Sequence, residues 1–553
     1  MKRREFLSGI SSAGVLGALG AFPAKASALD DLYSNRLLFD ETGVPLLPVR
    51  LMEGQRSVHI SSKGGMRVRV GSEQREQVLG PGEPLDVGHV FGAPALIREF
   101  SVLETLEGIK RQERFQALAR WRKRIADVQL HEVGGVYGVA GSVLDNRASL
   151  LVVPRALDSD EIQRWKLRPT SSEELLRLPG LGLDVRFPGG ERRVGSAKRP
   201  AWIRIRPAKG TELDIQRVEH SKGYANHGYA DRSFAGEVWL VPDRAGQIAV
   251  VNLVPESILV AGILPSEMFA SAPMATLKAQ AVTARGEIFA KVGRRHLGDP
   301  YLVCSAQCCQ VYKGRGAEHP RTTKAAEETA GEMAFLNGKL VDSVYSACCG
   351  GHTEPGHIVW DRPPTPALMG RADAAPADLR KSAWREKDLL DLSREEHVRK
   401  FLALPRELSF CGASTFNQKG DAFRWTKRFS RDELNRYLAE LELGEIKSLR
   451  VTGRGPGGRL RSLEIIGSAR RVRIDRELPV RKRFGNLRSG LFVIDEERDE
   501  RGTLLAVTFT GGGFGHGAGM CQQGAIGMAE AGYSYREILR HYYLGAKVVR
   551  IFS

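Results

Sequence analysis

The order of strand-like and helix-like segments is the feature that most constrains the fold of this 553-residue chain. Short pieces with alternating apolar and polar residues, such as 66–70, fill residues 44–103, and this period of two is typical of β-strands. Helices are predicted near residues 104–127 and at 275–291. Strands and helices do not alternate strictly, so the sequence predicts a mixed α+β fold rather than a doubly wound α/β fold.

The chain divides by composition into five predicted parts. We expect a signal peptide at 1–28, a linker at 29–43, a separate β-rich N-terminal α+β domain at 44–155, a connecting region at 156–234 and a second α+β domain at 235–553. A Thr-x-x-Glu capping box at Thr170 predicts a short helix in the connecting region, and Ser-x-x-Glu boxes recur at Ser393, Ser430 and Ser534. A proline-rich loop is expected at 362–379 within the second domain.

The amino terminus is typical of an exported protein. Arg3 and Arg4 precede an uncharged segment, residues 6–24, and small residues suited to cleavage follow it. The arginine pair indicates the twin-arginine (Tat) route, so we expect a periplasmic or cell-wall location. The alternative is an uncleaved anchor, but eight of the 19 uncharged residues are Gly, Ser or Pro, which is weak for a bilayer helix. The longest later apolar run, 258–264, is too short to span a membrane, so no span is expected in the mature chain.

The net charge and the glycine-rich motifs indicate which classes of ligand and partner this chain is expected to bind. Lys and Arg number 82 against 65 for Asp and Glu, a formal net charge of +17. Outside the cytoplasm a basic surface favours acidic partners such as cell-wall polymers. No nucleic acid is expected, because the charges are dispersed and no recognition motif occurs. No nucleotide is expected either, because the glycine-rich segment 511–519 has neither the Gly-Lys-Ser/Thr of a P-loop nor a G-x-G-x-x-G frame.

Glu267 is the candidate for acid–base chemistry. It is a lone carboxylate bracketed by apolar residues and a proline, and burial there would raise its pKa toward neutrality. The alternative is that Ser266 caps a helix and Glu267 lies in its first turn, where the helix dipole would lower its pKa. In the following helix, Lys278 and Arg285 are seven residues apart on one face, with Gln280 off that stripe.

A group of cysteines and one histidine suggests a metal. The group consists of His296, Cys304, Cys308 and Cys309. Three thiols and one imidazole suit tetrahedral zinc, although the spacing is not C-x-x-C and the two adjacent cysteines are awkward joint ligands. The alternative is a disulfide, for example to the later Cys348-Cys349 pair, which an oxidising compartment would permit.

Taken in order, five motifs resemble the SpoIID (stage II sporulation protein D) family, whose members act on peptidoglycan. They are 264–268 (Leu-Pro-Ser-Glu-Met), 277–285 (Leu-Lys-Ala-Gln-Ala-Val-Thr-Ala-Arg), 309–312 (Cys-Gln-Val-Tyr), 350–354 (Gly-Gly-His-Thr-Glu) and 515–520 (Gly-His-Gly-Ala-Gly-Met), the last followed by Gln522 and by His-Tyr-Tyr at 541–543. The resemblance covers roughly residues 235–553 and gives no information on residues 29–230.

The resemblance implies a lytic transglycosylase that cuts the β-1,4 bond between N-acetylmuramic acid and N-acetylglucosamine, with Glu267 as the single catalytic acid/base. The residues it implies as glycan contacts are Lys278, Gln280, Arg285, Gln310, Tyr312, Tyr345, Ser346, Gly350, Gly351, His352, Glu354, His516 and Gln522. Family members also hold a zinc by Cys and His in this stretch, which implies that His296, Cys304, Cys308 and Cys309 bind a structural zinc. Cys308 stands where a histidine is usual.

Two other functions fit the same motifs. The protein could be a non-catalytic enhancer of a cell-wall amidase, which would then be its partner, or a module that binds peptidoglycan glycan strands without cleaving them. An enhancer would need a second enzyme and would keep its activity after loss of Glu267. A binding module would sediment with purified sacculi and release no soluble fragments.

Overall fold

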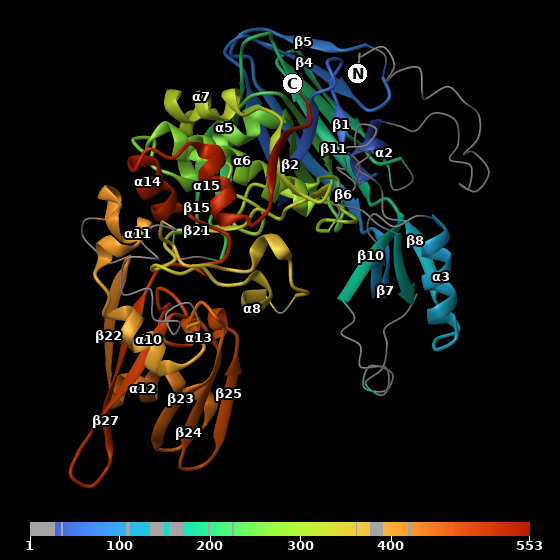
Figure 1. Cartoon of the computed structure of the whole chain (residues 1–553). Coiled ribbons are helices and arrows are strands. Elements are labelled where there is room, and N and C mark those ends of the chain that lie inside the picture. The colour runs from blue at the N-terminus through green and yellow to red at the C-terminus, as the bar shows by residue number, and fades with distance from the viewer. Residues whose placement is uncertain are drawn as a thin grey trace.

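The computed structural model describes residues 28–552, apart from residues 35–36, 74, 107–110, 133–148, 154–162, 164–169, 197–198, 224–225, 293, 361, 376–390 and 418–421. Nearly all of the predicted signal peptide and the end of the predicted proline-rich loop lie outside the described residues. The described part is a mixed α+β structure, as predicted, with helices and several separate sheets (Figure 1).

Two large sheets enclose the main hydrophobic core. The first has the strand order β1-β2-β17-β16-β13-β4-β5, with β18 beside β2, and the second has the order β12-β11-β6-β3-β14-β15. Their bounds are β1 Leu38–Phe39, β2 Pro45–Gln55, β3 Ser57–Ser61, β4 Met66–Val70, β5 Gln77–Leu79, β6 Leu85–Ala93, β11 Gly180–Phe187, β12 Gly190–Val194, β13 Ile203–Pro207, β14 Leu213–His220, β15 Gly228–Phe234, β16 Glu237–Pro242, β17 Ile248–Pro255 and β18 Val303–Cys304. Alternating side chains of the two sheets, such as Ile60, Leu183 and Val250, are fully buried between them.

The first sheet crosses the predicted domain boundaries. β17 pairs with β2 in antiparallel register, with Val251 opposite Arg50, and β18 pairs with β2 in parallel, with Val303 opposite Val49. Strands from residues 44–155 and from residues 235–553 therefore share one hydrogen-bonded sheet, so these two segments are not structurally separate as predicted.

A small four-stranded sheet with one helix projects from this body, at the lower right of Figure 1. Its strand order is β10-β7-β9-β8, and its elements are β7 Leu96–Leu106, α3 Arg111–Arg122, β8 Gln129–Glu132, β9 Ser149–Val153 and β10 Thr170–Arg177. The helix predicted from the Thr170 capping box is wrong, because this segment is strand β10 and Thr170 pairs with Val102 of β7. Its backbone groups are satisfied by the ladder, and this tertiary pairing overrides the local capping pattern.

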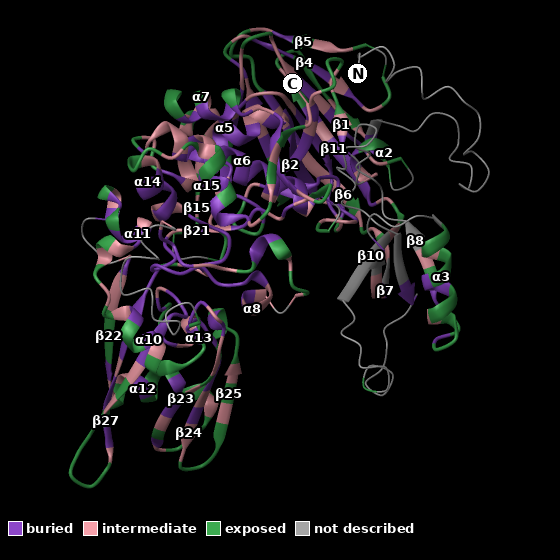
Figure 2. Ribbon diagram, in the orientation of Figure 1, coloured by how far each residue is buried: buried purple, intermediate pink, exposed green. Residues whose placement is uncertain are grey.

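Helices with many buried residues pack beside the first sheet (Figure 2). The elements of this layer are α5 Glu256–Glu267, α6 Met274–Lys291, α7 Pro320–Glu328, β19 Glu332–Leu336, β20 Lys339–Leu340, β21 Tyr345–Ser346, α8 Gly356–Trp360, β28 Met520–Cys521, α14 Gln522–Glu530, α15 Tyr535–Tyr542 and β29 Lys547–Arg550; α2 (Ala28–Tyr33) lies near the amino terminus. The predicted helix at 275–291 is confirmed as α6, and the Ser534 capping box forms at the start of α15.

An inserted lobe at the lower left of Figure 1 separates β21 from β28 in the sequence. Its sheets have the orders β22-β27-β26 and β23-β24-β25, and its elements are α10 Glu395–Leu402, α11 Phe410–Ala413, β22 Arg424–Ser430, α12 Arg431–Leu438, β23 Ile446–Arg454, β24 Leu460–Gly467, β25 Arg471–Asp475, α13 Glu477–Arg483, β26 Phe492–Arg498 and β27 Leu504–Gly512. The Ser430 capping box forms on α12, whereas α10 begins after Arg394 without a side-chain cap, so the box predicted at Ser393 is wrong. Short 3₁₀ helices lie at Arg315–Ala317, Pro366–Leu368, Arg406–Leu408, Thr415–Asn417 and Ala439–Leu441.

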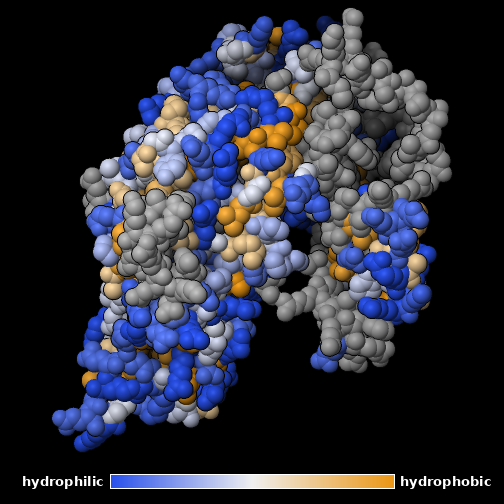
Figure 3. Space-filling model, viewed as in Figure 1, coloured by the Kyte–Doolittle hydropathy of each residue, from blue (hydrophilic) through white to orange (hydrophobic). Residues whose placement is uncertain are grey.

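The outer surface of the inserted lobe is mainly hydrophilic on the face shown in Figure 3. Within the described ranges, none of the helices has both the length and the apolar character needed to cross a bilayer.

Candidate active site and metal centre

Glu267 is the last residue of α5. The helix contains Pro265 and ends where the N–H of Met268 donates to the carbonyl of Leu264. Glu267 is therefore not in the first turn of a helix capped by Ser266, and that alternative is wrong. The carboxyl end of a helix carries partial negative charge, which disfavours an ionised carboxylate. Burial raises the pKa of Glu267 above its ordinary value, and the neighbouring charge of Glu287 adds to the rise.

Two segments contact Glu267, one just before and one just after the inserted lobe in the sequence. β21 and β28 pair in parallel, with Tyr345 opposite Met520, so Tyr345 and the next residue after β28, Gln522, come together. The Tyr345 hydroxyl hydrogen-bonds to the Glu267 carboxyl group, which partly opposes the rise in its pKa. Gln522 Nε2 donates to the Glu267 carbonyl oxygen at 2.7 Å and lies 3.3 Å from Gln280 Oε1. Four of the predicted site residues thus meet at one place.

A second buried carboxylate, Glu287, was missed in the sequence. Lys291 Nζ donates to Glu287 Oε1 at 2.7 Å, and Gln310 Nε2 donates to Glu287 Oε2 at 2.9 Å. In the sequence this Glu and Lys, four residues apart, look like an ordinary exposed helical ion pair, yet their side chains are only 17% and 15% exposed. Burial raises the pKa of Glu287, but the ammonium of Lys291 favours its ionised form. Glu267 has no ion pair among the described residues, so of the two it is the better proton donor.

Several polar atoms in the residues next to Glu267, Glu287 and Tyr345 are buried and lack a partner in the described structure. Gln280 Nε2, Gln310 Oε1, Ser266 Oγ and Ser346 Oγ are buried and have no hydrogen-bond partner among the described residues. Buried polar groups are nearly always paired. Gln280 and Gln310 are only 0% and 4% exposed, so these unpaired atoms make the interior beside the carboxyl group polar but offer no surface that a glycan could reach.

Three of the predicted glycan contacts have structural partners instead. Arg285 is fully buried and donates through Nε to Glu256 Oε2 at 2.5 Å. Tyr312 is 1% exposed and its hydroxyl donates to Asn252 Oδ1 at 3.2 Å. Lys278 pairs with Glu328 on α7. The burial of Arg285 and Tyr312 leaves neither side chain a surface that a glycan could reach, contrary to expectation.

The Gly-Gly segment, residues 350–354, packs against residues of the inserted lobe. Gly350 and Gly351 have φ values of 75° and 101°, which favour glycine, and a Cβ on Gly350 would lie 2.7 Å from the backbone nitrogen of Gly513. Glu354 is fully buried and accepts hydrogen bonds from the N–H groups of Gly457 and Arg459, and burial raises its pKa to about 7. His352, which is 4% exposed, accepts through its carbonyl from Arg459 Nη1 at 3.1 Å. These contacts give the segment a role in packing.

His516 contacts Tyr345, the residue whose hydroxyl hydrogen-bonds to the candidate acid. Its ring is 4.7 Å from that of Trp360, at the end of α8, and it contacts the backbone of Tyr345. Burial lowers the pKa of His516 to about 3, so its imidazole is neutral at physiological pH.

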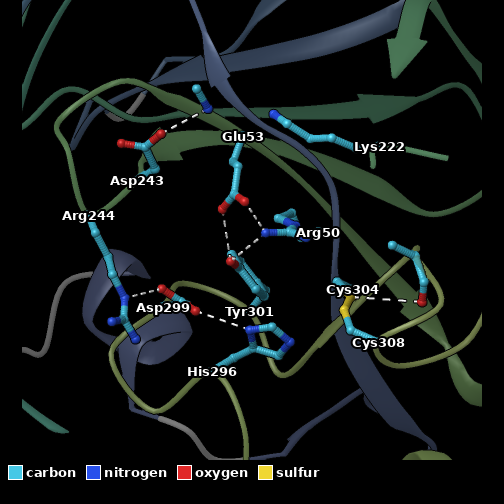
Figure 4. Close-up of polar contacts among 12 residues, drawn as sticks. Arg50, Glu53, Lys222, Asp243, Arg244, His296, Asp299, Tyr301, Cys304 and Cys308 are labelled. Atoms are coloured by element: carbon cyan, nitrogen blue, oxygen red, sulfur yellow. Dashed lines mark hydrogen bonds and ion pairs between the residues drawn. A yellow bond between two sulfur atoms is a disulfide. The ribbon is translucent and has the colours of Figure 1, made fainter. Parts of the chain in front are cut away.

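The predicted metal ligands also come together. One ligand atom from each of His296, Cys304, Cys308 and Cys309 lies within 4.8 Å of the others, so the group could hold a metal ion. Figure 4 shows Asp299 between Arg244 and the His296 ring; Asp299 Oδ2 lies 3.1 Å from His296 Nδ1. A carboxylate on one ring nitrogen orients the other toward a metal, and His296 Nε2 points at Cys309 Sγ, 3.4 Å away.

A disulfide joins Cys304 to Cys308, while Cys309 is a free thiol. The alternative bridge from this group to Cys348 or Cys349 does not form, since both are free cysteines in a different core. The Cα atoms of Cys304 and Cys308 are 7.1 Å apart, wider than disulfides usually span, whereas ligands of a tetrahedral ion can be that far apart. The residues therefore fit a structural zinc held by His296 and the three thiolates, with the disulfide as the alternative state.

Asp299 gives a test of this metal centre. We expect Asp299→Asn to weaken zinc binding about 10- to 100-fold, because the carboxylate that orients His296 is lost. Zinc competition with a chromophoric chelator measures the change, and Glu53→Gln is the control because Glu53 accepts from Tyr301 and not from His296. A purified protein that contains no zinc at this group and keeps the Cys304–Cys308 bridge would contradict the expectation.

Comparison with known proteins places these residues in a family. Residues 244–335 match the family model described as Stage II sporulation protein (SpoIID), and residues 354–519 match a domain of unknown function (DUF8618). The chain is 28% identical over 316 residues to an uncharacterized protein of Brachyspira hyodysenteriae, covering 57% of this chain and 72% of that protein.

Two named relatives come from Bacillus. The chain is 28% identical over 304 residues to the Amidase enhancer of Bacillus subtilis, covering 51% of this chain and 39% of the relative. It is 28% identical over 312 residues to Stage II sporulation protein D of Bacillus amyloliquefaciens, covering 54% and 75% respectively. Both the candidate acid, Glu267, and the candidate metal ligands lie within the matched segment 244–335. Residues 244–335 therefore carry a SpoIID domain, and the chain is similar to stage II sporulation proteins over more than half of its length.

Proposed function

We propose that this protein is a peptidoglycan lytic transglycosylase that cleaves the bond between N-acetylmuramic acid and N-acetylglucosamine in glycan strands. The SpoIID domain and the similarity to these relatives support a role at the cell wall. The observation that carries the finer proposal is Glu267, a partly buried carboxyl group with a raised pKa, held by Tyr345 and Gln522. Its Tat-type amino terminus would direct the protein to the periplasm or the cell wall.

A single carboxyl group is sufficient for this reaction. Protonated Glu267 donates its proton to the glycosidic oxygen, and the bond from that oxygen to C1 of N-acetylmuramic acid breaks. The resulting Glu267 carboxylate then takes the proton from the C6 hydroxyl of the same sugar as O6 bonds to C1. The products are a 1,6-anhydro end and a free C4 hydroxyl, and no water is consumed. Ordinary glycosidases need a second carboxylate as nucleophile or base.

The surroundings of Glu267 suit each part of this cycle. The neighbouring charge of Glu287 raises the pKa of Glu267 and so favours the protonated form of Glu267 before the reaction. The Tyr345 hydroxyl hydrogen-bonds to the carboxylate after the proton has left. The net positive charge of the chain favours the lactyl carboxylates of the glycan.

Tyr345 should set the pH dependence of the reaction. Glu267 must start protonated, so the rate should fall as the pH rises through its raised pKa. Tyr345→Phe removes a hydrogen bond that favours the ionised form, so the pKa of Glu267 should rise and the fall should move to higher pH. The profile of kcat/KM against pH measures this shift. Tyr543→Phe is the matched control, because the Tyr543 hydroxyl donates to the Val344 carbonyl; an equal shift in both variants would argue against the assignment.

The test of the proposed function is the chemistry of the product ends. Mass spectrometry of purified glycan strands incubated with the protein should show 1,6-anhydro ends, whereas reducing ends would mean hydrolysis with a second carboxylate, for which Glu287 is the first candidate.

A second function is favoured by one relative. The name Amidase enhancer raises the alternative that this chain stimulates a cell-wall amidase without cleaving glycan itself. That function predicts no product from the chain alone and full stimulation of the amidase by Glu267→Gln, whereas the transglycosylase predicts products from the chain alone and their loss in the variant.

A further inference from the structure

A second group of metal-binding side chains lies in the core formed by α6, α14 and α15. It consists of Cys349, Asp373, Cys411 and Cys521. All four residues are fully buried, and one ligand atom from each lies within 4.8 Å of the others. Cys349 is separated from Cys411 by 62 positions and from Cys521 by 172, so no spacing motif reveals the group in the sequence.

The three sulfur atoms are arranged as thiolate ligands would be. Cys349 Sγ and Cys411 Sγ are 3.6 Å apart, close to the roughly 3.8 Å expected for two thiolates on a tetrahedral ion with metal–sulfur bonds of about 2.3 Å. Cys521 Sγ accepts hydrogen bonds from the N–H groups of Cys349, at 3.1 Å, and Gly524, at 3.3 Å. Cys521 is also the N-cap of α14, where the helix dipole favours a negative sulfur.

Asp373 is held as a fourth ligand by its own partners. Its Oδ2 accepts from the N–H of Cys411 at 2.9 Å, and its Oδ1 accepts from the Tyr542 hydroxyl at 2.6 Å. His541 Nε2 lies 3.8 Å from Oδ1 and has no hydrogen-bond partner among the described residues. Such outer hydrogen bonds orient a ligating carboxylate and leave further lone pairs for a cation. A Cβ on Gly524 would lie 2.8 Å from both Asp373 oxygens, so only glycine leaves room there.

Two partly buried arginines, Arg424 and Arg371, lie near the group. The Arg424 guanidinium donates to the carbonyls of Gly350, at 2.8 Å, and Leu402, at 2.9 Å. Neither Arg424 nor Arg371 has an ion pair among the residues that the structure describes. Burial lowers the pKa of Arg424 to about 10, and the nearby thiols, Cys411 first, oppose that fall, so the side chain stays charged. A buried charge without a counter-charge is costly. Three thiolates, one carboxylate and one divalent cation carry two net negative charges, which these two guanidinium groups would balance.

We propose that Cys349, Asp373, Cys411 and Cys521 bind a structural Zn²⁺ ion. Thiolates select zinc, copper(I) or iron–sulfur clusters, and a carboxylate among four tetrahedral ligands fits zinc. On binding, the three thiols release their protons to solvent and no redox change occurs. The ion joins the loop after β21, the start of α14 and α11 of the inserted lobe. Tyr345 on β21 and Gln522 after Cys521 both contact Glu267, so this ion fixes the two segments that position the candidate acid.

Metal analysis of the purified full-length protein tests the site. The double variant Cys308→Ser/Cys309→Ser removes two of the four candidate ligands of the first metal centre. It should therefore bind one equivalent of zinc, at the second group. Adding Cys411→Ser or Asp373→Asn to it should remove that equivalent. Cys348→Ser is the control, because this buried cysteine contacts Cys411 and Cys521 but is not one of the four proposed ligands; that variant should keep the metal.

A second measurement, cobalt(II) substitution, tests the site even if the Cys411 and Asp373 variants fail to fold. Cobalt(II) exchanged into the Cys308→Ser/Cys309→Ser protein should give thiolate-to-cobalt charge-transfer absorption in the near ultraviolet, with three thiols released on chelation. A Cys349–Cys411 disulfide in the mass spectrum, the absence of metal and cobalt absorption from this protein, or equal metal loss in Cys348→Ser would overturn the proposal. None of these readouts depends on glycan cleavage, so the site can stand if the proposed function fails.

Discussion

Replacing Glu267 with Gln should reduce the release of anhydro-ended fragments about 10²- to 10⁴-fold, the contribution that a positioned general acid–base group typically makes. The amide keeps the size of the side chain and can still meet Tyr345, but it cannot deliver or remove the proton. Binding of glycan strands should change little, because the amide has nearly the same shape as the carboxyl group and the rest of the site is unchanged. Initial rates of fragment release and sedimentation with purified sacculi measure the two quantities separately.

The matched control for this variant is Glu318→Gln. Burial also raises the pKa of Glu318, but this carboxylate pairs with Arg315 and makes no contact with Glu267 in the described structure. Glu318→Gln should therefore retain the wild-type rate. Full activity in Glu267→Gln would contradict the assignment of the acid and would make Glu287 the next candidate.

The second large effect is expected on stability, at the ion pair between Arg285 and Glu256. Both side chains are buried, with 0% and 1% of their surface exposed, and the guanidinium also donates to the carbonyls of Glu332 and Ala326. Arg285→Met leaves an uncompensated buried carboxylate, so we expect the free energy of unfolding to fall by about 3–5 kcal/mol. Denaturant unfolding followed by circular dichroism measures the change.

Lys278 on the same helix provides the comparison. Its pair with Glu328 is partly exposed, at 26% and 39%, so Lys278→Met should change the free energy of unfolding by about 1 kcal/mol or less. The double variant Glu256→Leu/Arg285→Met should recover much of the loss, because it removes both buried charges. Similar small losses in Arg285→Met and Lys278→Met would contradict the structural role of the buried pair.

The sequence predicted the elements whose signals are local. Helix α6 has a long apolar face, and the Ser430 and Ser534 capping boxes form because each precedes a helix that nothing else displaces. The Thr170 box failed because pairing with β7 decides the conformation there. The shared sheet of β2 and β17 could not be predicted, because about 200 residues separate the partners and strand pattern alone does not choose them.

In the candidate site, too, only the residues that belong to short sequence motifs could be predicted. Glu267 and the first metal group follow from short motifs, but Glu287 looked like half of a surface ion pair, and only the fold shows that it is buried next to the acid. The family resemblance implied that Arg285 contacts glycan, whereas packing of α5 against α6 buries it with Glu256. The group around Cys411 depends on three distant segments, so no pattern in the sequence could indicate it.

Digestion of purified glycan strands in H₂¹⁸O is the measurement that tests the central claim most directly. Intramolecular attack by the C6 hydroxyl uses no water, so we predict anhydro ends that contain no solvent oxygen, with their formation lost in Glu267→Gln. Reducing ends labelled with ¹⁸O would show that water is the nucleophile and would contradict the transglycosylase mechanism.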